Sequence, residues 1–206
     1  MPIVEIDPSA QRDLVPPTGP AHTGAKQRIL ETADRLFYQE GIHSVGVDKL
    51  ISASSVTKAT FYKHYGSKDR LILDYLRAQH AEVEAQLDGI VDTAAGPEEA
   101  VLALIDEISA ETHSAGFRGC AFINAAAEFA DSRHPVREIV SSHRDWYTSR
   151  LTGLLRQAGH PLPGDAADEF ILARDGAMTG AYAGDPVSAT AALQRVGARI
   201  LSETAV

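Results

Sequence analysis

The segment from Ser54 to Leu71, SSVTKATFYKHYGSKDRL, gathers side chains that suit contact with a polyanion. It carries four Lys or Arg and three aromatic rings, in a chain whose formal net charge is −9. Its hydroxyl, ammonium and imidazole groups can donate hydrogen bonds to base edges or phosphates, and a methyl group can approach thymine. The residues that we expect to supply these contacts are Thr57, Lys58, Ala59, Thr60, Tyr62, Lys63 and His64.

The excess positive charge of the chain lies in one block around this segment. Residues 22–70 hold eight Lys or Arg against five Asp or Glu, whereas residues 71–206 hold ten against twenty. A basic block on an acidic body suits a protein that touches DNA with one face. So small an excess is also consistent with ordinary surface variation, and charge alone leaves both interpretations open.

Helices must hold these side chains in place. Apolar residues at helical spacing predict a helix over residues 25–40, which Gly41 ends, and a shorter helix over residues 47–53. After a break long enough only for a turn, a third helix follows over residues 57–65. Two helices of about seven to nine residues joined by a short turn have the size of a helix-turn-helix, whose second helix enters the major groove.

The two ends of the third helix carry residue types that start and stop helices. Thr57 can cap its first turn, and Gly66 can adopt the left-handed conformation that ends it. Ser67 can then cap a long helix. We expect Lys68, directly after this cap, to place its charge beside the exposed N–H groups of the long helix and to anchor one phosphate.

At these residues the sequence resembles a known family. The run from Gly41 to Ile72, GIHSVGVDKLISASSVTKATFYKHYGSKDRLI, is similar to the DNA-binding region of the TetR family of bacterial repressors, whose usual run is close to T-x-x-x-I-A-x-x-A-G-V-S-x-x-T-L-Y-x-H-F-x-S-K-x-x-L. The matching positions are Asp48, Leu50, Ala53, Val56, Thr57, Thr60, Phe61, Tyr62, Tyr65, Ser67, Lys68 and Leu71. The resemblance implies an all-α protein that represses transcription until a small-molecule effector releases it from DNA.

The resemblance also implies a division into parts. Together with the proline-rich start of the chain, it predicts a flexible N-terminal arm over residues 1–22 and a three-helix helix-turn-helix DNA-binding domain over residues 23–70. A larger helical domain over residues 71–206 would bind the effector and dimerise. The partners implied are a palindromic operator in double-stranded DNA, a second copy of this chain and an unknown small-molecule effector.

Three positions depart from the family pattern. Ser55 replaces the glycine of the turn, so a residue with a side chain must adopt positive φ at a cost of about 1 kcal/mol. Gly46 stands where the family often has a phosphate-binding threonine, and Ser44 is the nearest hydroxyl that could replace it. Ala59 stands where many members have glycine, which should stiffen the recognition helix.

The remainder of the chain has the pattern of long, buried helices. Apolar residues cover one broad face of residues 134–160, and small residues follow in the helix expected over residues 165–185. By resemblance, these two helices and their two-fold copies would form a four-helix dimer interface. The residues that we expect at this interface are Trp146, Arg150, Leu154, Gly176, Ala177 and Gly180.

The helix that follows the Gly119–Cys120 pair is the part of the sequence that best suits an effector site. Apolar walls with a few hydrogen-bonding groups are the mixture that a drug-sized pocket needs. The candidate pocket residues are His113, Phe117, Phe122, Ile123, Asn124, His143, Trp146 and Tyr147. These side chains could equally fill the core, and the sequence leaves both interpretations open.

The sequence gives little support for catalysis or for a metal or cofactor site. The chain has one cysteine, Cys120, and no His pair at metal-ligand spacing, so we expect no metal, no cofactor and no catalytic activity. The single thiol and the lack of an apolar run near the roughly 18 residues of a membrane span favour a cytoplasmic protein with no membrane partner. Two rivals stay open, a regulator that acts through a protein partner without sequence-specific DNA binding and a thiol enzyme centred on Cys120.

Overall fold

The computed structural model describes residues 24–204, which form nine α-helices and no strand. The predicted all-α class is confirmed, and the predicted N-terminal arm lies outside the described residues. The helices are α1 (Ala25–Glu40), α2 (Val47–Ala53), α3 (Lys58–Tyr65), α4 (Lys68–Thr93), α5 (Pro97–Thr112), α6 (Ala121–Glu128), α7 (Pro135–Gln157), α8 (Pro163–Tyr182) and α9 (Pro186–Ser202). None of these nine is long and apolar enough to cross a membrane.

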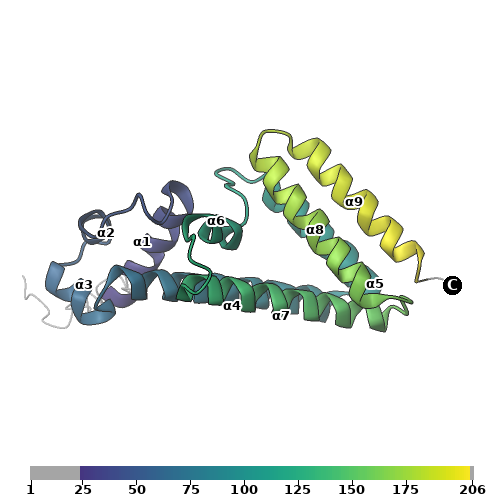
Figure 1. The fold of residues 1–206 in the computed structure, drawn as a ribbon, viewed down its shortest axis with the longest axis horizontal. Helices are drawn as coiled ribbons and strands as arrows, with labels where there is room; N and C mark the ends of the chain where they lie inside the picture. The colour runs from purple at the N-terminus through teal and green to yellow at the C-terminus, as the bar shows by residue number, and fades with distance from the viewer. Residues whose placement is uncertain (1–23, 205–206) are drawn as a thin grey trace, which may run out of the picture.

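The first three helices pack together at one end of the molecule, as Figure 1 shows. Their common core contains Ile29 and Phe37 of α1, Leu50 of α2 and Phe61 of α3, each at most 3% exposed. Burying such side chains away from water is the main force that joins short helices, which are marginal in isolation. The helix boundaries expected from the sequence agree with those observed to within a residue.

The caps predicted around α3 are present. The Thr57 hydroxyl accepts a hydrogen bond from the Thr60 amide at 3.1 Å, and the Ser67 hydroxyl accepts one from the Arg70 amide at 3.2 Å. Gly66 has φ of +73°, a value that side chains disfavour. Ser55 has φ of +52°, so it occupies the left-handed region as its place in the turn predicted.

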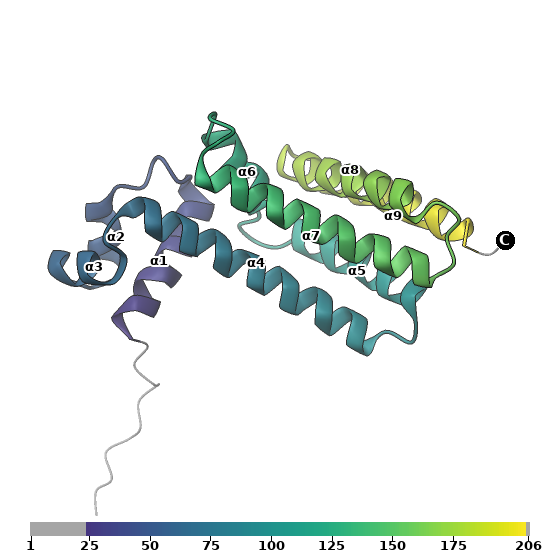
Figure 2. The same cartoon turned by 60° about the horizontal axis from the view of Figure 1, so that its bottom comes forward.

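Helix α4 joins the two parts of the chain. Its first residues follow α3 directly, and its 26 residues extend along the remainder of the molecule, where it packs on α5, α6 and α7 (Figure 2). The domain boundary expected between residues 70 and 71 therefore falls within the first turn of one continuous helix. Because a helix is stiff over this length, α1–α3 are attached to the larger part through a rigid element rather than a linker.

The larger part is a helical bundle in which α8 and α9 pack closely along their lengths. Helices α5, α7, α8 and α9 each begin with a proline in the first turn, where the missing N–H costs nothing. The Asp185 carboxylate caps α9 by accepting from the Ser188 amide at 2.9 Å.

A glycine sets the distance between α9 and α5. Gly197 is buried, and a methyl group added there would overlap the side chain of Ile105 on α5. By contrast, Gly89 in α4 has no neighbouring atom within 4 Å of the position that such a methyl group would occupy. The sequence alone does not distinguish the two glycines, because both lie in helix interiors.

We expect Gly197→Ala and Gly89→Ala to differ in the free energy of unfolding. Both changes gain about 0.5–1 kcal/mol from helix propensity, but only Gly197→Ala overpacks the α5–α9 contact, at about 1–3 kcal/mol. Denaturant unfolding should therefore place Gly197→Ala below Gly89→Ala by roughly that amount. Ile105→Val removes the overlapping methyl and should recover part of the loss in the Gly197→Ala background, whereas equal stabilities for the two alanine variants would refute this packing account.

Candidate functional site

Helix α3 presents one face to solvent and buries the other. Phe61 and Tyr65 are at most 3% exposed, and the Tyr65 hydroxyl donates to the Lys26 carbonyl of α1 at 2.9 Å. Burial raises the pKa of Tyr65 to about 12, so the phenol keeps its proton and its bond at neutral pH. The predicted DNA-contacting residues lie on the opposite side, where Thr57, Lys58, Ala59, Tyr62, Lys63 and His64 are exposed and Thr60 is half-buried.

Two threonine hydroxyls at the start of α3 are coupled. The Oγ1 atoms of Thr57 and Thr60 are 2.8 Å apart, so one hydroxyl donates to the other. The Thr57 oxygen also accepts the capping N–H of Thr60. The pair is therefore left with one O–H proton to donate outward, which restricts how it can meet a base edge or a phosphate.

Lys68 lies in a different setting from the one expected. Its ammonium donates to the Ile42 carbonyl at 2.6 Å and lies 5.9 Å from the centre of the Phe37 ring. Partial burial lowers the pKa of Lys68, against the attraction of Glu128 and Asp69. The ammonium thus has an internal role, and its contact with phosphate stays a prediction. Ser44, the other expected phosphate contact, is exposed in the turn between α1 and α2.

The turn between α1 and α2 is held from the other side by α6. The Glu128 carboxylate accepts the Ile42 amide at 2.7 Å and the His43 amide at 2.6 Å, and lies 3.3 Å from the His43 ring nitrogen. Gly41, with φ of +91°, lets this carboxylate approach closely, since an added methyl group would lie 3.3 Å from it. The backbone of Ile42 is therefore held at its N–H by Glu128 and at its C=O by Lys68.

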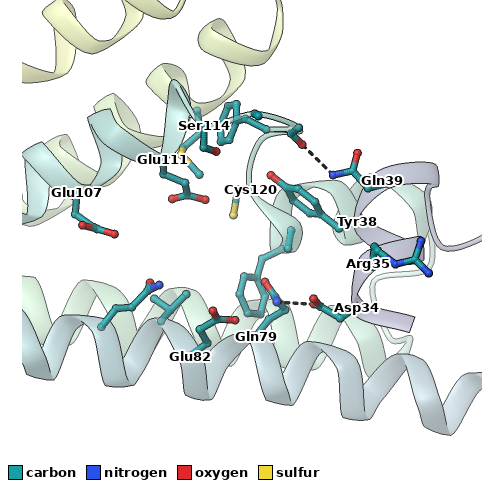
Figure 3. Close-up of a pocket in the computed structure, with 18 of the residues that line it drawn as sticks. Asp34, Arg35, Tyr38, Gln39, Gln79, Glu82, Glu107, Glu111, Ser114 and Cys120 are labelled. Carbon is teal, nitrogen blue, oxygen red and sulfur yellow. Dashed lines mark hydrogen bonds between the residues drawn. The ribbon is translucent and has the colours of Figure 1, made fainter. Parts of the chain in front are cut away.

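A cleft of about 440 Å³ lies between the α1–α3 end and the larger bundle. Helices α1, α4, α5, α6 and α8 and the α5–α6 connection all contribute to it. Its lining residues are Asp34, Arg35, Tyr38, Gln39, Gln79, Glu82, Val83, Gln86, Glu107, Glu111, Ser114, Ala115, Gly116, Phe117, Cys120, Ala121, Phe122, Arg174 and Met178. Figure 3 shows Glu82 of α4 facing Glu107 and Glu111 of α5 across it.

The wall of the cleft is tied to α1 by hydrogen bonds. The Tyr38 hydroxyl donates to the Gly119 carbonyl at 3.0 Å and accepts from the Arg118 amide at 2.9 Å. The Gln39 amide donates to the Gly116 carbonyl at 3.0 Å. A group that filled the cleft would consequently press on α1 and on the α5–α6 connection together.

The residues expected from the sequence to form a pocket are divided between two places. Phe117 and Phe122 line the cleft, while Phe122, His143 and Tyr147 line a separate cavity of only about 20 Å³. Asn124 donates to the Arg118 carbonyl at 2.8 Å, and His113 is exposed at the end of α5. Ile123 and Trp146 pack against the core. These eight residues do not form one site.

His143 is a core histidine in this structure. It is 4% exposed, its Nδ1 lies 3.1 Å from the Nδ1 of His80, and its ring stacks on Phe122 with centres 3.6 Å apart. Burial, followed by the positive charge of Arg174, lowers the pKa of His143 to about 3. The ring is therefore neutral at physiological pH, and one of the two imidazoles must donate to the other.

Sequence reasoning missed the polar residues of the cleft. Asp34 and Tyr38 lie four residues apart on α1, as do Glu107 and Glu111 on α5, so each pair shares one helix face. The signal in the sequence that could have found these residues was a pair of polar residues at this spacing beside an apolar stripe. Such pairs are equally typical of an ordinary solvated helix face, and only the packing of α1, α4 and α5 brings them to the same cleft.

The residues expected at a dimer interface mostly make contacts within the chain. Leu154 and Ala177 are at most 6% exposed, and Gly180 faces Ala189 of α9. Arg150 forms an ion pair with Asp88, and Trp146 lies against His80. Gly176 alone among the six is exposed with open space beside it. Their role in an interface stays a prediction.

This architecture, a helix-turn-helix with an exposed second helix on a larger helical bundle, defines a DNA-binding transcriptional regulator. The sequence profile of the bacterial regulatory proteins of the tetR family matches residues 29–75. A crystal structure of a TetR-family regulator from Streptomyces coelicolor is 37% identical, covers 88% of this chain and 96% of its own, and superposes with a TM-score of 0.85. The chain belongs to the TetR family.

Two characterised regulators are also similar. The HTH-type transcriptional regulator LmrA of Bacillus subtilis is 25% identical over 66% of this chain and 73% of its own. The HTH-type transcriptional repressor AcnR of Corynebacterium glutamicum is 32% identical over 38% of this chain and 43% of its own. Regulators of this family bind DNA, typically act as dimers with small-molecule effectors, and are generally not enzymes.

We expect Glu128→Ala to loosen the turn between α1 and α2. The change leaves the Ile42 and His43 amides without their acceptor, which should cost about 1–2 kcal/mol. Hydrogen exchange of these two amides should accelerate by roughly tenfold, while exchange in α8 and α9 stays unchanged. Glu84→Ala, which removes an exposed carboxylate from α4, is the matched control. Unaltered protection of Ile42 in Glu128→Ala would show that α6 does not hold the turn.

Proposed function

We propose that this protein is a homodimeric, sequence-specific repressor that a small-molecule effector releases from a palindromic operator. The observation that carries the proposal is the exposed, capped face of α3, which offers Lys58, Lys63 and the Thr57–Thr60 hydroxyl pair on a rigid support. A helix of this size fits the major groove, where its first residues meet base edges. The acidic remainder of the chain would be repelled by DNA, which favours docking through this face alone.

Dimerisation supplies the second α3. Two half-sites one helical turn apart require recognition helices about 34 Å apart. The open face of α8 is the surface we propose for the contact, because Leu172 is 70% exposed and Gly176 beside it leaves room for a close approach. Val187, at the start of α9, is also 70% exposed.

The cleft is the proposed effector site, and α6 is the proposed connection to DNA binding. The helix contributes Phe122 to the cleft at one end and Glu128 to the Ile42 and His43 amides at the other. An effector that prefers the conformer with badly spaced recognition helices would shift the population towards it. A preference of about 1.4 kcal/mol already gives a tenfold release.

Selection of bound DNA from a random pool, using the purified protein, tests the proposal. A palindromic consensus with two half-sites would support it. Binding that is unselective and strongly dependent on salt would contradict it and favour the rival in which the protein regulates through a protein partner.

We expect Lys63→Ala to weaken binding to all DNA sequences alike. Each Lys63 lost from a half-site removes about one phosphate contact, so the slope of log affinity against log salt should flatten by about one per half-site. Titration of labelled operator at several salt concentrations measures this slope. Arg156→Ala, which removes one positive charge at the far end of α7, should leave the slope intact. A slope that did not change in Lys63→Ala would remove this residue from the contacts.

For Thr60→Ala we expect a change in base preference. The loss of one hydroxyl frees Thr57 to bond elsewhere, which alters the donor pattern that the first turn of α3 presents to the groove. Repeating the selection from the random pool should give a consensus altered at one or two positions in each half-site. An unchanged consensus with uniformly weaker binding would assign Thr60 to a phosphate contact instead.

A further inference from the structure

The cleft carries more negative charge than the side chains around it neutralise. Its ionisable lining includes four carboxylates, from Asp34, Glu82, Glu107 and Glu111, and two guanidinium groups, from Arg35 and Arg174. These six groups come from α1, α4, α5 and α8, which places acidic groups on three sides of the space.

Among the described residues, neither guanidinium forms an ion pair with the carboxylates between α4 and α5. Arg35 is exposed and points away from the space in Figure 3. Arg174 is held on the other side by Asp175, with an Nη1–Oδ1 distance of 3.0 Å, and by the Tyr147 ring, 5.1 Å from its central carbon. Within residues 24–204, the carboxylates of Glu82, Glu107 and Glu111 form no ion pair and accept no hydrogen bond.

The electrostatics around these groups agree with the geometry. Glu111 is exposed, yet the protein around its carboxylate raises its pKa by desolvation. The positive charge of Arg174 opposes this rise, and repulsion from Glu107 and Glu82 adds to it. Desolvation likewise raises the pKa of Asp34, and Glu82 adds to it, although a hydrogen bond from Gln79 at 2.7 Å opposes the change. A positive charge placed between these groups would relieve the repulsion.

The remaining walls suit a carbon-rich molecule. Tyr38, Phe117 and Phe122 bring three aromatic rings to the cleft, and Val83 and Met178 add aliphatic surface. Aromatic faces attract cations as well as apolar groups, and a volume of about 440 Å³ is in the range of pockets for drug-sized ligands. The charge and the walls therefore point to the same kind of molecule.

A bare metal ion fits this site less well. Across residues 24–204, no three His, Cys, Asp or Glu side chains lie close enough together to coordinate a metal. The cleft carboxylates are spread along about one turn of α5 and across to α4, so they match a charge carried on a larger body.

We infer that the cleft binds an organic cation, with its positive charge among Glu82, Glu107 and Glu111 and its apolar or aromatic body against Tyr38 and Phe122. The inference rests on the proposed function in that the cleft is taken as the effector site, and it adds the chemical class of the effector. A ligand in this position would touch α1, α4 and α5 together, and so both parts of the protein at once.

Isothermal titration calorimetry of the full chain without DNA tests this inference. The probes are two cations of different bulk, tetraphenylphosphonium and benzyltrimethylammonium, each compared with an anion of similar shape, tetraphenylborate and benzenesulfonate. We expect at least one cation to bind with one site per chain and its matched anion to bind at least tenfold more weakly. Failure of both cations to bind, or equal binding of the matched anion, would overturn the inference.

Two double variants distinguish cation binding in the cleft from attraction of the cation to the general surface charge. Glu107→Gln with Glu111→Gln removes two carboxylates from the cleft and should weaken cation binding at least tenfold. Glu84→Gln with Asp106→Asn removes two exposed carboxylates from the same helices, outside the cleft lining, and should change binding by less than twofold. Equal losses in the two double variants would overturn the inference, since the cations would then be attracted only by the net charge.

Operator titration with the same proteins separates this inference from the proposed function. Cation binding in the calorimeter does not depend on DNA, so a protein that bound the cation but selected no DNA sequence would refute the proposed function and support the cation site. A protein that bound a palindromic operator but neither cation would keep the repressor assignment and overturn the inference.

Discussion

The backbone of Ile42 is the point on which the two parts of this protein depend. Glu128 of α6 accepts its N–H and Lys68 of α4 donates to its C=O, so the two peptide groups that flank this residue are bonded to both neighbouring elements. Hydrogen bonds with a charged partner are stronger than neutral ones, and losing either would leave a partly buried polar group unsatisfied. The orientation of α1–α3 relative to the bundle is thereby linked to the position of α6.

This arrangement explains how a cleft on one side of α1 can influence a helix on the other. Tyr38 and Gln39 bond the α5–α6 connection, and Tyr65 of α3 bonds the first turn of α1. Since α1 is a single helix, movement of its cleft side under the proposed function would be passed to the support of α3. Packed helices change position between discrete arrangements rather than by continuous deformation, which suits a regulator with two states.

Local signals in the sequence were reliable where neighbouring residues decide the structure. The caps of Thr57 and Ser67 and the positive φ of Ser55 were predicted and are confirmed. Lys68 shows the limit of this reasoning, because its place after a cap suggested a free charge for phosphate, whereas its ammonium is bonded to Ile42. That partner is 26 residues away, and no local pattern indicates it.

The sequence by itself determined the helices, the family motif and the exposed side chains of α3, because these depend on spacing, capping and contacts within a few residues. Only the tertiary structure decided the cleft and the α6 contacts. Carboxylates at Asp34, Glu82 and Glu111 lie on helix faces that each resemble ordinary solvated surface, and they line one cleft only because three helices pack together. Packing between distant helices is set by the summed burial of many side chains, which no single stretch of sequence contains.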